Sequence, residues 1–105
     1  MIWFVHPSDE MPDESTVLKV QAYDDKEALT KAHALRYENY SEVDSVGWSQ
    51  EYDLYTTVQW VSMLEQLGDS EDEKLLDTIH KSLGVTRHDV YTKAVIETVV
   101  RRVIY

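Results

Sequence analysis

The chain has 105 residues, 43% hydrophobic and 29% charged, which suits a single domain with one core and excludes a disordered composition. It contains no cysteine, which excludes disulfides, thiolate nucleophiles and cysteine metal sites. Twenty acidic residues against ten basic residues give a net charge of −10, which attracts basic partners and repels nucleic acid and anionic membranes.

Two short strands are predicted at the start of the chain. Met1 to His6 is a bulky, β-prone run that ends at Pro7, and Thr16 to Tyr23 alternates apolar and polar residues. An acidic loop with two prolines, residues 7–15, lies between them. We therefore expect the two strands to pair antiparallel across this loop.

A helix is predicted to begin at Asp24, whose side chain is placed to cap the first free backbone N–H groups. Its apolar spacing fades at residues 39–40, and residues 41–48 fit either a loop or a third short strand. Over 53–67 the apolar spacing favours a helix that ends at Gly68, although the residues of 51–61 also suit a strand.

Two further helices are predicted in the last third of the chain. Ser70 and Glu73 have the spacing of a capping box for a helix that Gly84 closes, and Thr86 is placed to cap a final helix. The β-branched residues of 95–104 would also suit a closing strand. Strands early and helices late predict an α+β fold: two or three short antiparallel strands with a helix packed on them, followed by a C-terminal helical layer.

No catalytic or metal-binding pattern is recognisable. The four histidines lack metal-ligand spacing, and the three glycines form no phosphate-binding loop. His33 and His80 lie beside leucines on predicted helices, where we expect surface or boundary positions. We therefore expect neither an enzyme nor a cofactor.

The acidic excess is confined to one part of the chain. Residues 1–68 carry thirteen Asp and Glu against four Lys and Arg, whereas residues 69–105 carry seven against six. We interpret 1–105 as a single domain with an acidic, strand-rich part over 1–68 and a helical part over 69–105. No apolar run reaches the about 20 residues of a membrane span, and Met1–Val5 lack a basic leader, so we expect a cytoplasmic protein.

Such a lopsided charge suggests a binding function, because self-repulsion costs stability in a small domain. Tyrosine and tryptophan supply anchors in protein interfaces, and carboxylates around them favour a basic partner surface. The candidate partner-binding residues are Asp9, Glu10, Asp13, Glu14, Asp24, Asp25, Glu38, Glu42 and Asp44, with Trp48 and Tyr52 as anchors.

Residues Val20–Leu29, with Ala32 following, resemble the strand-then-helix start of many small phage- and plasmid-encoded proteins, among them some anti-CRISPR proteins. This resemblance implies a mobile-element origin and binding without catalysis. Together with the charge it predicts an inhibitor whose carboxylates stand in for phosphates. Its target would be the nucleic-acid-binding or regulatory surface of a basic host protein.

The last third of the chain resembles the two-helix unit of ribbon-helix-helix regulators and antitoxins. The residues that carry this resemblance are Leu75–Leu76 through Ile79, Leu83–Arg87, Asp89–Tyr91 and Ala94–Val95. That family reads DNA with a basic strand before the first helix, whereas residues 67–72 here are acidic. The resemblance therefore implies no direct nucleic-acid binding. The alternative function is a dimeric regulator or antitoxin-like protein that associates through the C-terminal helix pair, with Val90, Ala94, Val95, Val99 and Val103 in the dimer contact.

Overall fold

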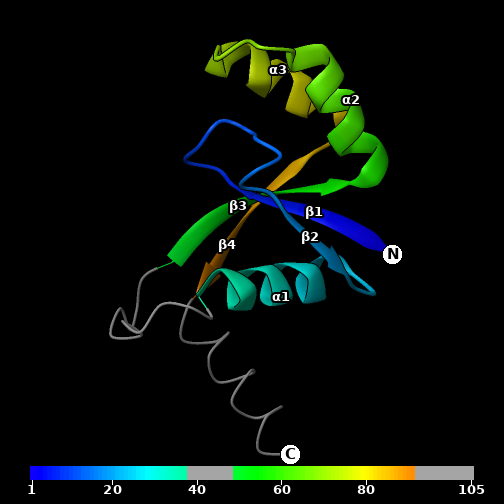
Figure 1. Ribbon diagram of the computed structural model, residues 1–105, viewed down its shortest axis with the longest axis vertical. Helices are drawn as coiled ribbons and strands as arrows, with labels where there is room; N and C mark the ends of the chain where they lie inside the picture. Colours follow the sequence, from blue (N-terminus) through cyan, green and yellow to red (C-terminus); the bar gives the residue numbers. More distant parts are fainter. Residues whose placement is uncertain (38–48, 92–105) are drawn as a thin grey trace, which may run out of the picture.

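In the computed structural model, which describes residues 1–37 and 49–91, four antiparallel strands form one sheet with helices on both faces (Figure 1). The α+β fold class is thus confirmed, with four described strands where two or three were predicted. The elements are β1 (Ile2–Pro7), β2 (Leu18–Gln21), α1 (Asp25–Tyr37), β3 (Ser49–Thr56), α2 (Thr57–Leu67), α3 (Glu73–Leu83) and β4 (Thr86–Tyr91). The strand order across the sheet is β2-β1-β3-β4.

The predicted pairing of the first two strands is confirmed. β1 and β2 run antiparallel, with Trp3 opposite Val20 and Val5 opposite Leu18. The other side of β1 pairs antiparallel with β3, where Phe4 faces Tyr55. The bulky N-terminal run is therefore a central strand, which explains why its side chains are apolar on both faces.

Side chains that alternate along the strands build a separate hydrophobic cluster on each face of the sheet. On one face, α1 packs its alanines Ala28 and Ala32 against Val5 and Leu54. On the other face, α2 and α3 form the second cluster with β3. This second cluster consists of Tyr55, Trp60, Met63, Leu67, Leu76 and Ile79. Burial of one such large side chain contributes about 1.5–3 kcal/mol.

The predicted helix over 53–67 is wrong at its start, because β3 continues to Thr56 and α2 begins at Thr57. A capping box fixes this boundary. The Thr56 hydroxyl accepts from the backbone N–H of Gln59 at 3.2 Å, and the Gln59 side-chain oxygen accepts from the N–H of Thr56 at 2.9 Å. The strand alternative considered for 51–61 is therefore correct over residues 51–56.

The residues that α2 buries also differ from those that the apolar spacing over 53–67 would place on one helix face. Trp60, Met63 and Leu67 point into the core, whereas Val58 is 78% and Val61 48% exposed. Leu54 lies on β3 and faces α1. Aromatic and thioether side chains fill the space under this helix because they bury more surface than valine.

The helix predicted over 70–83 is present as α3, but its cap is Asp72, which accepts from the N–H of Lys74 at 3.0 Å. Gly84 ends it in the left-handed region at φ 74°, as predicted. The helix predicted after Thr86 is wrong over residues 86–91, which form β4, so the C-terminal layer is not entirely helical. The other residues of the predicted dimer face, 94–103, lie outside the described residues.

Candidate functional site

The six candidate acidic residues within the described part of the chain are all exposed, but they occupy two separate places. Asp9, Glu10, Asp13 and Glu14 lie in the loop between β1 and β2, which rises on the α2–α3 side of the sheet (Figure 1). Asp24 and Asp25 lie at the start of α1, on the opposite side. The predicted acidic surface is therefore divided between two faces.

The remaining candidate residues do not join these two sets. Glu38, Glu42, Asp44 and Trp48 lie outside the described residues. Tyr52, predicted as a partner anchor, is fully buried under α1, which corrects that prediction. Its hydroxyl lies 2.5 Å from Nδ1 of His33, which is also buried. Tyr52 faces the core because its position on β3 has the same parity as Leu54.

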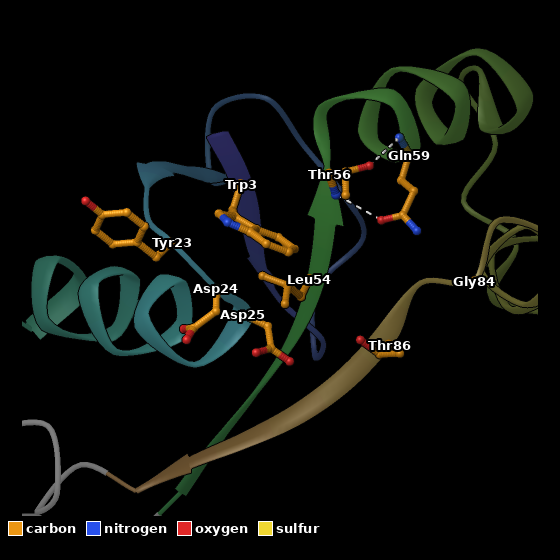
Figure 2. A pocket seen from close by; sticks show the side chains of 9 residues that line it. All are labelled: Trp3, Tyr23, Asp24, Asp25, Leu54, Thr56, Gln59, Gly84 and Thr86. Carbon is orange, nitrogen blue, oxygen red and sulfur yellow. Dashed lines mark hydrogen bonds between the residues drawn. The ribbon is translucent and has the colours of Figure 1, made fainter. Parts of the chain in front are cut away.

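An open groove with a volume of about 430 Å³ lies where the start of α1 meets the sheet (Figure 2). Its floor includes Leu54 and the half-buried Trp3, whose indole N–H donates to the carbonyl of Ala22 at 3.3 Å. Thr56, Gln59, Gly84 and Thr86 line it from the side of α2 and β4. The groove thus combines an apolar floor with polar groups at its edge.

Two carboxylates stand at the edge of this groove, and the helix start fixes both of them. Oδ1 of Asp24 accepts from the backbone N–H of Glu27 at 2.8 Å, which confirms the predicted cap. Oδ1 of Asp25 accepts from the N–H of Lys26 at 2.8 Å. Within the described part of the chain, the second oxygen of each carboxylate has no hydrogen-bond donor and faces solvent.

Tyr23 separates the groove from a second hollow of about 280 Å³. Its side chain is 93% exposed, the highest value among the large hydrophobic residues that the structure describes. The second hollow is charge-balanced, because Lys31 and Glu27 on its wall form a salt bridge of 2.8 Å. The first groove has two carboxylates and no basic residue in its lining.

Polar residues that the sequence reasoning missed form a row on the other face of the sheet, in which His6 and Asp53 are buried and Arg87 is exposed. His6, Asp53 and Arg87 lie opposite one another on β1, β3 and β4. Nε of Arg87 lies 3.0 Å from Oδ1 of the buried Asp53. This pairing raises the pKa of Arg87. A strand over 51–56 would have revealed the row, since Asp53 and Tyr55 then share one face.

His80 was expected near the surface, but it is buried against β3. The Tyr55 hydroxyl lies 2.6 Å from its Nε2. Burial raises the pKa of Tyr55, with a further contribution from Asp53, so the phenol stays protonated. Its O–H donates a hydrogen bond to the imidazole of His80. Burial lowers the pKa of His80. These residues line neither hollow, and their pairing stabilises the fold.

In the described residues, no group of three or more His, Asp and Glu side chains is placed to hold a metal ion. No described helix is long and apolar enough to cross a membrane. No family model, curated protein or solved structure matches the chain. The groove beside Tyr23 and the two exposed acidic sets are therefore the features from which a function can be proposed.

Proposed function

We propose that this protein is a non-catalytic, acidic binding module that inhibits a basic host protein by occupying its nucleic-acid-binding or regulatory surface. We also propose that the protein is cytoplasmic and that it acts in the manner of the small phage-encoded inhibitors it resembles. The observation that carries it is the groove at the start of α1, where Asp24 and Asp25 stand over an apolar floor beside the exposed Tyr23.

This arrangement suits an arginine or lysine side chain of a partner. The aliphatic stem packs on Trp3 and Leu54, and the cationic head reaches the free oxygens of Asp24 and Asp25. Hydrogen bonds between charged groups contribute about 1.5–3 kcal/mol. A cation over the face of Tyr23 adds about 0.5–1 kcal/mol at an exposed site.

The acidic loop residues have a different part in this proposal. Because they lie on the other side of the sheet, a flat partner surface seated on the groove does not contact them. Their field still extends about 8 Å at physiological ionic strength, and it accelerates the approach of a basic protein. We therefore assign contact to Asp24 and Asp25, and steering to the loop set Asp9, Glu10, Asp13 and Glu14.

The test is capture of a partner from host-cell lysate by the tagged protein, followed by mass spectrometry at low and high salt. We expect one basic, nucleic-acid-binding protein whose capture falls as salt rises. The double variant Asp24→Asn with Asp25→Asn should lose at least tenfold in affinity for it, which corresponds to about 1.4 kcal/mol. Asparagine preserves the helix cap, so the loss reports charge and not folding.

A matched control removes the same number of charges elsewhere. Asp69→Asn with Glu71→Gln changes two exposed residues between α2 and α3, neither of which lines the groove. This control should keep the wild-type affinity. Two outcomes would contradict the proposed role of the groove. One is equal affinity of the wild type, the double variant and the control for the partner, and the other is capture that does not depend on salt.

A further inference from the structure

The imidazole of His6 lies fully buried beneath the loop between β1 and β2. In the structure this acidic loop spans residues 8–17, whereas 7–15 were predicted from the sequence. Its Nε2 lies 2.6 Å from the hydroxyl of Thr16 and 3.4 Å from the backbone nitrogen of Asp13. Its Nδ1 lies 2.8 Å from the carbonyl oxygen of Pro7. One ring on β1 is thus bonded to the second half of the loop, through Asp13 and Thr16.

These partners define where the proton of His6 resides. The Pro7 carbonyl only accepts, so Nδ1 carries the hydrogen. The Asp13 N–H only donates, so Nε2 is its acceptor. The Thr16 hydroxyl has one hydrogen, which it directs either to Nε2 or to the Asp13 carbonyl at 3.3 Å. The contact with the Asp13 N–H therefore requires neutral His6. A proton on Nε2 would meet the Asp13 N–H directly and break that contact.

The surroundings of the ring come from three elements besides β1. Trp60 of α2 stacks on it, with ring centroids 6.2 Å apart. Asp53 lies opposite it on β3, and Glu10 and Asp13 are the acidic loop residues whose charges act on it. Burial is the largest influence and lowers the pKa of His6 below 6.5, although the three carboxylates and the Pro7 carbonyl oppose this shift.

We propose that His6 is a proton-controlled latch, and that protonation of its Nε2 releases the acidic loop 8–17 from the sheet. The loop is what separates the ring from water, so opening it hydrates the imidazolium and removes the cost of burying a charge. The opening repositions Asp9, Glu10, Asp13 and Glu14 together. The release is a property of this chain alone, and its effect on a partner rests on the proposed function.

The second half of the loop is able to open without loss of the core, whereas Ser8 is held to β3 by its N–H, which donates to the Glu51 carbonyl at 3.0 Å. The loop contributes two half-buried side chains, Met11 and Val17, to the edge of the α2–α3 cluster. Its internal hydrogen bonds run from the N–H groups of Thr16 and Val17 to the Asp13 carbonyl, at 3.1 and 3.0 Å. The sheet pairing of β1 with β2 and β3 does not depend on these bonds.

The experiment follows amide hydrogen exchange and the His6 ring by NMR between pH 7.5 and 5, on the whole chain. The measured quantity is the protection factor, which corrects for the intrinsic dependence of exchange on pH. We expect protection of the Asp13 amide, which donates to the ring, to fall about tenfold per pH unit between 6.5 and the His6 midpoint, as one bound proton requires. Amides of β1 and β3 should stay protected.

His6→Gln should remove the pH dependence of the loop amides, and His88→Gln, a change on β4, should leave it as in the wild type. If His6→Gln does not fold, the wild type alone gives the test. The latch is supported when the fall in loop protection levels off at the pH where the His6 ring is half titrated. The latch is disproved if the loop stays protected through the His6 titration. It is equally disproved if loop and sheet amides lose protection together, since that is global unfolding.

Discussion

The buried hydrogen bond between Tyr55 and His80 joins the sheet to α3. Tyr55→Phe removes the donor to Nε2 of His80, which is 2.6 Å away, and leaves that nitrogen buried without a partner. We expect the free energy of unfolding at pH 7.5 to fall by about 1–3 kcal/mol, measured by urea denaturation. The ring and its packing on Trp60 are kept in this variant.

Tyr23→Phe is the matched control for this residue. The same hydroxyl is deleted, but from a side chain that is 93% exposed, so stability should change by less than about 0.5 kcal/mol. Equal losses in the two variants would mean that the Tyr55–His80 contact adds nothing to stability.

Among the helices, α1 allows the structural and the functional role of one carboxylate to be separated. Asp24 caps the helix through the N–H of Glu27. Asp24→Ala should therefore destabilise the protein by about 1 kcal/mol, whereas Asp24→Asn should cost only a few tenths, because asparagine caps equally well. Thermal unfolding followed by circular dichroism measures both. A loss for Asn as large as for Ala would show that charge, not the cap, stabilises this end.

The elements that sequence reasoning predicted well are those with local start and stop signals. The capping role of Asp24, the end of the first strand at Pro7 and the end of α3 at Gly84 are all present in the structure. Each signal acts through the backbone geometry of one or two neighbouring residues, so no knowledge of distant contacts is needed.

The elements that it missed are decided by distant contacts. Residues 53–56 suit both helix and strand, and residues 86–91 were predicted as helix. Both become strands because β3 pairs with β1 and β4 pairs with β3. The groove was equally hard to predict from the sequence, because residues far apart in the chain form it. Exposed Asp24 and Asp25 were predictable, but its floor joins Trp3 and Leu54 from two different strands. Tyr52 was misjudged because its burial follows from the strand parity of β3.

At the scale of the whole molecule, the acidic residues and the buried histidines respond to pH in opposite directions. The net charge of −10 repels itself in the compact state, and acidification toward the pI of about 4.6 relieves this repulsion. Against this, burial lowers the pKa of His6 and of His80 in the folded protein. The unfolded chain, whose histidines titrate near 6.5, therefore binds more protons below that pH.

The histidine effect should dominate between pH 6.5 and 5, because carboxylates remain largely ionised there. Together, His6 and His80 contribute a slope of at most about 2.7 kcal/mol per pH unit. Their stabilisation is fully present above 6.5 and lost as pH falls toward the folded pKa values. We expect urea unfolding at 0.5 M salt, which screens surface repulsion, to give a steadily lower free energy from pH 7.5 to 5. His6→Gln and His80→Gln should each reduce this slope. A stability that rises on acidification at this salt concentration would show instead that acidic self-repulsion governs the fold.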